Sequence, residues 1–375
     1  MNIRIKIIGV GGAGSNAVAR LNTAGLGHIP TAVVNTDAQA LETCTVDQKY
    51  LIGRALTYGL GTGGDPAKGR DCAHAEAALL KELVDEVDLL FLVGGLGGGT
   101  GSGAMPAIAQ MASKGSAIVI AFAAMPFAME GGKRRQVAED ALSELRRHCH
   151  AAIALPNDLL LQQVGQEATV LEAFKQSDQW IGRGIGAITA MLLKPGLMNL
   201  DLANVRQALS ITGGRALFGF GFGTGQDAPQ AALNNLMLCP LLQTPDLRSH
   251  TDGLLVNILG GPELSIHAVN EMLAFITEKF GGRENVAVGA VVDERYREKV
   301  GVCVLGVTDI GKGAHHAPNQ KFITKPQKDD DSQDEFTFVS KGQLRGYFDK
   351  TERNYFEGED LDVPTYLRKG IKINF

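Results

Sequence analysis

The sequence lacks the excess of basic residues that a dedicated nucleic-acid-binding protein usually carries. Its 375 residues include 36 lysines and arginines against 41 aspartates and glutamates, which gives a formal net charge of −5. Proteins that bind nucleic acid do so largely by neutralising phosphates with a basic surface. We therefore expect no nucleic-acid partner.

Cysteines are few and their spacing suggests no pairing. There are five, an odd number, and none belongs to a C-x-x-C motif. This pattern predicts buried free thiols in a reducing compartment instead of a disulfide framework. His148 and His150 flank Cys149, but two ligands without a distant second pair predict no metal site.

Features that direct a chain to or through a membrane are also missing. The N-terminus, MNIRIKIIGV, continues directly into a strand-like pattern and has no signal-peptide core or cleavage site. Residues 89–113 are uncharged, but their seven glycines and one proline make them too weakly hydrophobic to span a bilayer. We expect a cytoplasmic protein with no direct membrane insertion.

Glycine, in contrast, is abundant. The chain has 47 glycines, about one residue in eight, against an average near 7%. There is no G-X-Y repeat, which excludes a collagen, and 45% of the residues are hydrophobic, which excludes a fully disordered chain. The glycines are therefore expected in loops that need special backbone geometry or that approach a ligand closely.

The hydrophobic pattern of the first half predicts a doubly wound, Rossmann-like α/β domain. Short apolar runs alternate with helical patterns such as residues 69–86 and 134–147. The runs show little polar alternation, which is typical of parallel strands covered on both faces. They cover residues 3–8, 31–35, 87–93, 117–123 and 152–155.

The second half predicts a long helix followed by a smaller α+β domain. Apolar positions at helical spacing run from residue 168 to 194, and Pro195 ends the pattern. Beyond it, residues 254–258, 286–292 and 302–307 resemble strands, and residues 266–280 resemble a helix. The division that we expect is 1–167, 168–194, 195–312, a flexible and disordered linker at 313–358, and a docking peptide at 359–375.

Three glycine-rich loops indicate a phosphate-bearing ligand. Residues 9–14 (GVGGAG) follow the first strand, and Asp37 ends the second, which by themselves suit an NAD-dependent oxidoreductase. Residues 59–66 (GLGTGGDP) and 94–103 (GGLGGGTGSG) form two further loops. In the last of these, Thr100 and Ser102 add hydroxyl donors. Three loops after separate strands favour a mononucleotide whose phosphate chain is longer than the pyrophosphate of a dinucleotide. The NAD-dependent oxidoreductase, a different class of protein, remains the alternative.

The run GGGTGSG at residues 97–103 resembles the signature loop of the tubulin/FtsZ GTPase family. The resemblance extends over nearly the whole chain and is closest to the bacterial FtsZ branch. Further matching segments are residues 11–16, VNTDA at 34–38, residues 59–66, PFAMEG at 126–131, PND at 156–158 and GLMNLD at 196–201. Residues 306–312 nearly spell a P-loop, but Gly313 stands where that motif needs serine or threonine.

The resemblance implies a GTP/GDP site, with Mg²⁺ on the phosphates, and assigns residues to it. Asn16 would lie near the guanine, Glu130 and Arg134 near the ribose and base, and Phe174 would stack on the base. The other implied binding residues are Gly11, Gly12, Ala13, Gly14, Ser15, Gly97, Gly98, Gly99, Thr100, Gly101, Ser102 and Asn157. Spacing alone leaves other interpretations open: a helix cap for Asn16, a surface ion pair for Glu130 and Arg134, and a core position for Phe174.

Asp178 matches the position that binds the edge of the guanine in this family. A carboxylate there can accept hydrogen bonds from guanine N1–H and the 2-amino group. In the family a second acid usually follows, whereas here the next residue is Gln179. This departure makes selectivity for guanine a weaker expectation than the phosphate site.

The implied catalytic residues are Asn199, Asp201 and Asn204, which follow the long helix. In the family this segment enters the nucleotide pocket of the next subunit in a head-to-tail homopolymer. The family pattern is N-x-D-x-x-D, and Asn204 replaces its last acid. The substitution predicts slow hydrolysis, or, as an alternative, a structural homologue that does not hydrolyse GTP.

The resemblance also implies a cellular role. It predicts a cytoskeletal filament at the bacterial division site, where it forms the division ring. The peptide from Leu361 to Arg368 (LDVPTYLR) resembles the family's C-terminal segment, which docks on membrane-tethering division proteins.

Overall fold

The computed structural model describes residues 3–161, 170–194, 196–198, 200–211, 213–242, 251–281 and 285–309. The chain divides into two compact units, Met1–Ala317 and Pro318–Phe375. In the second unit only the backbone of two short antiparallel strands is described, β12 (Tyr355–Phe356) and β13 (Glu359–Asp360). The predicted linker and docking peptide otherwise lie outside the described residues.

The first sheet has six parallel strands in the order β3-β2-β1-β4-β5-β6. They are β1 (Ile5–Val10), β2 (Thr31–Asn35), β3 (Gln48–Leu51), β4 (Leu89–Gly95), β5 (Ile118–Met125) and β6 (Ala151–Pro156). The predicted Rossmann-like α/β domain is thereby confirmed. The sequence pattern missed β3, because it is a short edge strand whose residues Gln48 and Lys49 are polar and exposed.

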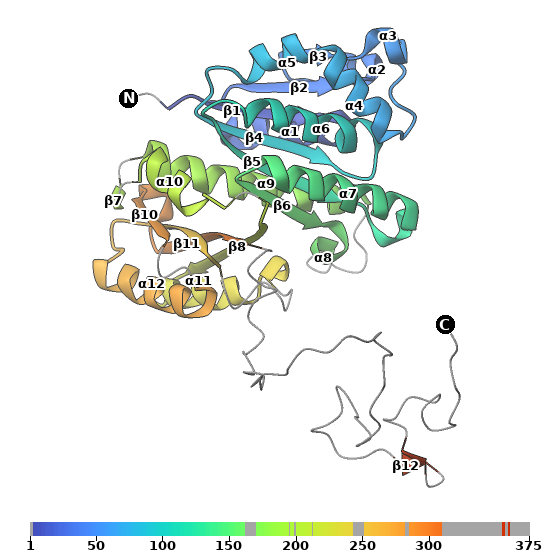
Figure 1. The fold of residues 1–375 in the computed structure, drawn as a ribbon. Helices are drawn as coiled ribbons and strands as arrows, with labels where there is room; N and C mark the ends of the chain where they lie inside the picture. Colours follow the sequence, from blue (N-terminus) through green and yellow to red (C-terminus); the bar gives the residue numbers. More distant parts are fainter. Residues whose placement is uncertain are drawn as a thin grey trace, which may run out of the picture. The chain divides into compact units, whose positions relative to one another are not determined.

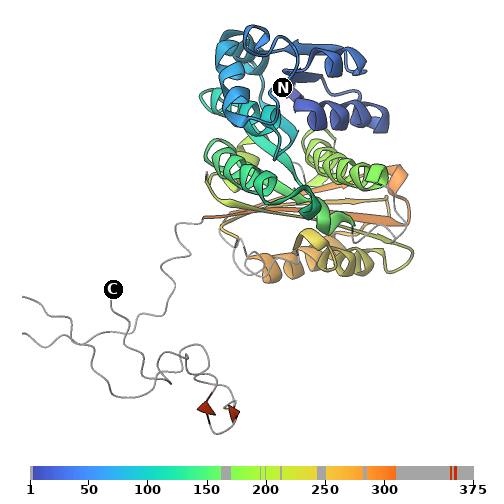
Figure 2. The same ribbon diagram turned by 90° about the vertical axis from the view of Figure 1, so that its right-hand side faces the viewer.

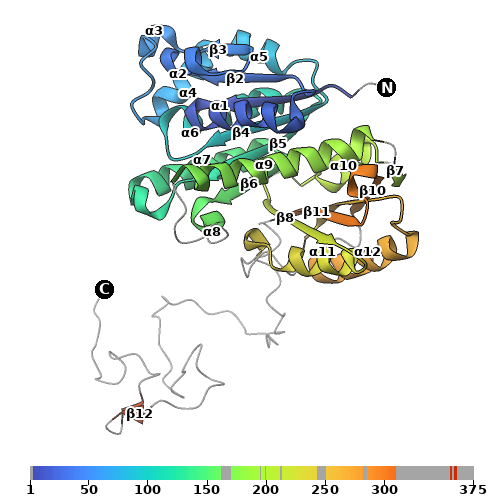
Figure 3. The same cartoon turned by 180° about the vertical axis from the view of Figure 1, so that it is seen from behind.

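Both faces of this sheet are covered by helices, as the apolar strands predicted. Ile7, Phe91 and Phe122 point to the face covered by α1 and α9, while Ile8 and Leu92 point to the opposite face. Figure 3 shows α1 and α9 together on the first of these faces. The helices of this half are α1 (Gly11–Leu21), the π-helical turn η1 (Asn22–Leu26), α2 (Ala38–Thr43), α3 (Arg54–Thr57), α4 (Pro66–Ala75), α5 (Ala77–Val84), α6 (Gly99–Ala112), η2 (Ala128–Glu130), α7 (Gly132–His148), α8 (Asn157–Leu161) and α9 (Val170–Leu193).

The second sheet has five strands in the order β7-β10-β9-β11-β8. Only β9 and β10 run parallel to each other; the remaining neighbours are antiparallel. The elements are β7 (Gly196–Met198), α10 (Leu202–Ala208), β8 (Arg215–Thr224), α11 (Ala228–Met237), η3 (Pro240–Leu242), β9 (Gly253–Gly260), α12 (Ile266–Phe280), β10 (Val286–Val292), η5 (Glu294–Tyr296) and β11 (Lys299–Thr308). Figure 2 shows this sheet between α9 above and the helices α11 and α12 below.

Strand β8, with the sequence RALFGFGFGT, was not predicted. Its glycines alternate with phenylalanines, and the glycine side lies against α11: a Cβ at Gly221 would lie 2.1 Å from the carbonyl oxygen of Ala232. The helix backbone therefore approaches the strand too closely for any side chain. A strand in which every second residue is glycine resembles a loop in sequence, which is why the apolar pattern did not reveal it.

The long helix α9 lies between the two sheets and joins their cores (Figure 1). At Gly184 the ring of Phe122 from β5 meets that of Phe218 from β8, edge to face, with centroids 5.8 Å apart. Trp180 packs on Phe218 in the same manner at 6.3 Å. Further along, the side-chain amide of Asn257 donates a hydrogen bond of 2.7 Å to the backbone carbonyl of a helix residue. The two domains therefore share one packed interior.

We predict that a side chain at Gly184 separates these contacts. A Cβ there would lie 2.6 Å from the Phe122 ring and 2.9 Å from the Phe218 ring. Gly184→Val should lower the free energy of unfolding by about 1–3 kcal/mol, the usual cost of overpacking. Urea unfolding followed by the fluorescence of the single tryptophan, Trp180, measures the change.

Gly186→Ala is the matched control, because the nearest atom to its added Cβ is 3.8 Å away. Replacing this helical glycine should instead stabilise the protein by about 0.4–1 kcal/mol. If both variants were equally stable, Gly184 would not be a point of close contact.

Candidate functional site

A cavity of about 510 Å³ opens at the carboxyl edge of the six-stranded sheet. It is lined by the ends of β1, β4 and β5, at Val10, Gly95 and Met125, and by Asn157 directly after β6. The strand order reverses between β1 and β4, and ligands of open α/β sheets bind at such a switch point. We refer to this space as the nucleotide cavity, after the ligand that the sequence predicts for it.

Two helices begin at the cavity, with glycines in their first turns. The loops are shorter than the glycine runs at residues 9–14 and 94–103 suggest: α1 begins at Gly11, inside the first run, and α6 begins at Gly99, inside the third. Neither start has a side-chain cap in the described structure, whereas Asp37 and Asp65 cap α2 and α4. The first backbone N–H groups of α1 and α6 are therefore available to an anion, which the helix dipoles also favour.

The glycines around the cavity fall into two groups. At Gly14 and Gly101 a Cβ would lie 2.3 Å from the Val93 carbonyl oxygen and 2.1 Å from the Gly95 carbonyl oxygen. These glycines allow the backbone to pack on itself. At Gly12 and Gly98 a Cβ would meet nothing within 4 Å, although both residues line the cavity. Protein packing therefore does not require glycine at either position, and the open space leaves room for a ligand to approach the backbone.

The hydroxyl groups predicted as phosphate donors have different positions. Thr100 lines the cavity, and its Oγ1 lies 2.6 Å from Oγ1 of Thr36. Ser102 is buried, and its hydroxyl accepts a hydrogen bond of 2.8 Å from the backbone N–H of Gly97. Of the predicted binding residues, Gly14, Ser15, Gly97 and Ser102 do not line the cavity. They lie behind the lining.

The far end of the cavity contains an acid and an arginine. Nε of Arg20 on α1 donates to Oδ2 of Asp178 on α9, and both residues line the cavity together with Asn16. Burial raises the pKa of the Asp178 carboxyl, although the bond from Arg20 partly opposes the effect. An acid with a raised pKa contributes stability at low pH, and this contribution is lost as the pH rises through that pKa. The charged form therefore costs stability at neutral pH, and a ligand that donates to it offsets the cost.

Two buried polar atoms on the lining have no partner within the described part of the chain. They are Oδ1 of Asn157 and Oγ of Ser177. Buried polar atoms nearly always form a hydrogen bond. Together with the open space at Gly12 and Gly98, they indicate a polar ligand that spans the cavity.

Glu130 and Arg134 both line the cavity and also pair with each other. Their ion pair measures 2.5 Å between Oε2 and Nη1, and Oε1 of Glu130 accepts from the backbone N–H of Phe127 at 2.9 Å. Asp158 accepts from the N–H of Ala128 at 2.9 Å, which fixes the same turn. The sequence offered two interpretations of Glu130 and Arg134, a surface ion pair and a position in the binding site. The structure shows both the ion pair and the position on the cavity lining.

Comparison with protein-family models gives two matches. Residues 4–165 match the GTPase domain of the tubulin/FtsZ family, and residues 214–311 match the C-terminal domain of the FtsZ family. Together they cover more than half of the chain. The chain belongs to the tubulin/FtsZ family.

Individual relatives agree with this assignment. The cell division protein FtsZ of Methanothermobacter thermautotrophicus is 35% identical over 335 residues, covering 88% of this chain and 87% of the relative. A solved structure of an empty FtsZ dimer from M. jannaschii is 30% identical, has a TM-score of 0.75, and covers 83% of this chain and 90% of its own. CetZ1 from Haloferax volcanii, a GDP-bound monomer, shares the fold at 22% identity, with a TM-score of 0.69 and coverage of 81% and 94%.

Family membership makes the chain a GTPase of the tubulin/FtsZ type that binds GTP or GDP. It also decides against the NAD-dependent oxidoreductase. Asp37, on which that alternative relied, caps α2 by accepting from the N–H of Ala40 at 3.0 Å. None of the helices in the described part of the chain has the length and hydrophobicity of a membrane span.

Two of the three residues that the family resemblance assigned to catalysis, Asp201 and Asn204, do not line the cavity. Asp201 and Asn204 form a capping box at the start of α10: Oδ1 of Asp201 accepts from the N–H of Asn204 at 2.8 Å, and Oδ1 of Asn204 accepts from the N–H of Asp201 at 3.3 Å. Both are exposed. From Asp178 to Leu193, α9 extends roughly 22 Å at 1.5 Å per residue, so the two sets of residues lie at opposite ends of this helix.

Phe174 belongs to α9, but its side chain lies outside the described part of the structure, as does Asn199 entirely. Gln179, which stands where the family usually has a second acid, is exposed and lines a neighbouring cavity, whose lining also includes Arg20 and Asp178.

Sequence reasoning missed several lining residues. Arg20, Thr62 and Ser177 line the nucleotide cavity but were not predicted. Arg20 follows Asn16 by four residues and Ser177 follows Phe174 by three, so a search for helical neighbours of the predicted residues would have found both. Thr62 belongs to the second glycine loop.

We predict that Gly98→Val removes GTP binding without unfolding the protein. The added side chain enters open cavity space, and the backbone at Gly98 (φ −98°, ψ 176°) is extended, which valine tolerates. GTP affinity should fall by more than about tenfold, or about 1.4 kcal/mol, as measured by calorimetric titration.

Gly132→Val is the matched control. Gly132 also has no atom within 4 Å of an added Cβ and begins a helix, but it does not line the cavity. It should bind GTP normally. Unchanged GTP affinity in Gly98→Val would place the phosphates elsewhere. Gly101→Val is a poorer test, because its side chain would strike the Gly95 carbonyl.

Proposed function

We propose that the protein assembles head to tail into filaments and hydrolyses GTP at each junction, where one subunit supplies the nucleotide cavity and the next supplies the segment 199–204. The observation that carries the proposal is the separation along α9. The cavity lies beside Asp178, whereas Asp201 and Asn204 follow the other end of the helix. Within one chain they cannot meet. The dimer recorded for a 30% identical FtsZ supports self-association.

In the bound state, the starts of α1 and α6 hold the phosphates and the Asp178 end holds the guanine. The unpaired N–H groups near Gly12 and Gly98 face the phosphate chain. Asp178 accepts from N1–H and the 2-amino group of guanine, which offsets the cost of its buried charge. The orphan hydroxyl of Ser177 lies next to it, while Glu130 and Arg134 lie near the ribose.

Mg²⁺ fits this site mainly through the nucleotide. Mg²⁺ prefers oxygen ligands and usually binds through substrate phosphates, water and one or two protein groups. The two carboxylates on the cavity lining, Glu130 and Asp178, are each paired with an arginine. Thr100 is therefore the side chain that we assign as a protein ligand. The ion would neutralise charge on the phosphates.

Hydrolysis at the junction depends on the neighbour's Asp201 and Asn204. A carboxylate can accept a proton from the attacking water, whereas the amide of Asn204 can only orient that water. We therefore propose that GTP turnover is slow and that Asp201 acts as the general base. In the isolated subunit both side chains also stabilise the start of α10.

The remaining proposals concern the cell. We propose that the filaments form the division ring at the cytoplasmic face of the division site, as the family resemblance implies. Residues 313–358 would act as a flexible linker, and the segment from Leu361 to Arg368 would dock on membrane-tethering division proteins. About 46 linker residues would span 35–40 Å, at roughly 5–6 Å times the square root of their number.

A mixing experiment tests the shared junction. Gly98→Val loses the nucleotide but keeps its catalytic segment. Asp201→Asn keeps GTP binding and the helix cap, since asparagine caps helices well, but loses the carboxylate. We expect each variant alone to be almost inactive, and an equimolar mixture to hydrolyse GTP well above the sum of the two. Phosphate release and GTP-dependent sedimentation are measured together. Activity equal to the sum would mean that each site is completed within one chain.

A second prediction concerns Asn204 itself. Asn204→Asp should raise GTP turnover per assembled subunit at least about tenfold, because general-base contributions are commonly 10²–10⁴-fold. It should also shorten polymer lifetime after GTP is exhausted. The aspartate retains the acceptor for the N–H of Asp201 and is favoured in the first turn of a helix, so the fold should be unaffected.

Ala203→Asp is its control, because it adds the same charge to the same exposed helical turn without replacing the amide. It should leave turnover nearly unchanged. Equal acceleration in both variants would point to general electrostatics, and no acceleration in Asn204→Asp would leave the chemistry to Asp201 or another group.

A further inference from the structure

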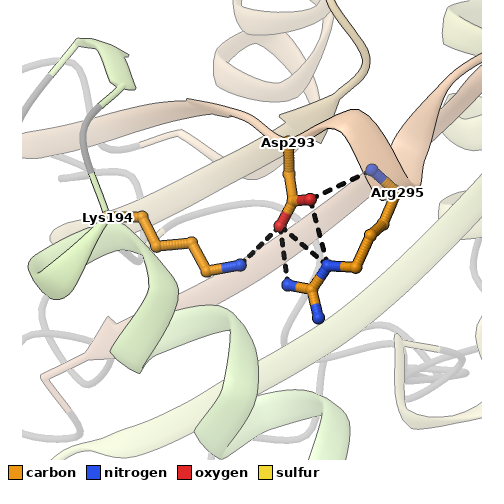
Figure 4. A network of polar contacts seen from close by, with 3 residues as sticks. All are labelled: Lys194, Asp293 and Arg295. Carbon is orange, nitrogen blue, oxygen red and sulfur yellow. Dashed lines mark hydrogen bonds and ion pairs between the residues drawn. The ribbon is translucent and has the colours of Figure 1, made fainter.

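A three-residue ion cluster lies just after the end of α9 (Figure 4). Nζ of Lys194 lies 2.5 Å from Oδ2 of Asp293. The guanidinium of Arg295 binds the same carboxylate at 2.7 Å through Nη2, and through Nε at 3.0 and 3.2 Å. The Asp293 side chain is only 13% exposed. Arg295 first, and then Lys194, hold the pKa of this carboxyl well below its usual range, so the carboxylate stays charged throughout the neutral range.

The carboxylate belongs to a rigid part of the second domain. Asp293 directly follows β10 and caps η5, accepting from the N–H of Arg295 at 3.0 Å. Its own N–H donates to the carbonyl of Gly260, at the end of β9, at 2.9 Å. Lys194, by contrast, is the first residue after α9, and its N–H still donates to the carbonyl of Ala190. The ion pair thus joins the end of the central helix to the sheet.

Strand β10, which Asp293 directly follows, also pairs with the chain that leads to the catalytic segment. Asp201 follows Lys194 by seven residues, and β7 in between pairs antiparallel with β10. This pairing is weak: β7 has three residues, its register shifts between Ala290 and Val291, and Leu197 and Met198 are about half exposed. Short edge strands with little burial gain little stability from pairing. The capping box fixes only the far end, at Asp201.

We propose that Lys194 and Asp293 are positioning residues for GTP hydrolysis: their ion pair fixes the start of the 195–201 segment against β10, so that the Asp201 carboxylate is presented to the next subunit in one orientation. The inference rests on the proposed function. It assigns a role to side chains that touch neither the nucleotide cavity nor the capping box.

The test uses the full-length chain with Lys194→Met and Asp293→Asn. Amide hydrogen exchange in residues 196–204 of the unassembled protein should become faster in both. GTP turnover per polymerised subunit should fall about tenfold or more, since small misplacement of a reacting group has effects of that order. GTP affinity of the monomer and the thermal midpoint should be unchanged. Lys194→Arg should restore normal turnover, and the double variant should be no slower than the slower single one.

Glu294→Gln is the matched control. Glu294 neighbours Asp293 but pairs with Arg297 at 2.7 Å, with both side chains at least 70% exposed. It should change neither exchange nor turnover. Unchanged exchange in Lys194→Met and Asp293→Asn would overturn the proposal, as would faster exchange with unchanged turnover. If the unaltered chain shows no assembly-dependent turnover, the proposed function fails. The exchange result still decides whether the ion pair holds the segment.

Discussion

The contact of Phe122 and Phe218 across Gly184 is the constraint on which the arrangement of the two domains depends. One ring comes from the parallel sheet and the other from the mixed sheet, and they meet edge to face at α9. A helix lined with small residues lets both sheets approach it, and the buried amide of Asn257 adds a polar anchor to the helix backbone. Because aromatic pairs prefer defined geometry, this junction fixes how each sheet lies against the helix. The cavity at one end of α9 and the catalytic segment at the other are therefore held at a set separation.

Much of this architecture could be predicted from local patterns. The central strands of the parallel sheet are continuous apolar runs because both of their faces are covered, and α9 shows a helical period that Pro195 ends. Strands β3 and β8 escaped for different reasons. The first is a polar edge strand, and the second is glycine-rich because its neighbour α11 packs backbone against backbone. Neither the edge position of β3 nor the packing of β8 on α11 can be recognised from a short stretch of sequence.

Only part of the candidate site could be predicted, because the roles of its residues also depend on neighbours that are distant in the sequence. Runs of glycine marked the phosphate end, but the sequence could not show that Gly14 and Gly101 serve backbone packing while Gly12 and Gly98 face open space. That distinction depends on which carbonyls lie opposite, such as those of Val93 and Gly95. Nor could it show the capping box of Asp201 and Asn204, which explains in structural terms why an amide is tolerated there.

The approach of α4 to α6 has a mechanical consequence. A Cβ at Gly69 would lie 2.4 Å from the Gly99 carbonyl oxygen, and one at Gly103 would lie 2.1 Å from that of Pro66. Side chains between two helices can change rotamer and absorb a small displacement, but bare backbones have no such compliant layer. Along this contact α4 and α6 can move only as one stiff body. Since Gly99 and Thr100 at the start of α6 line the nucleotide cavity, a displacement of that start carries α4 with it.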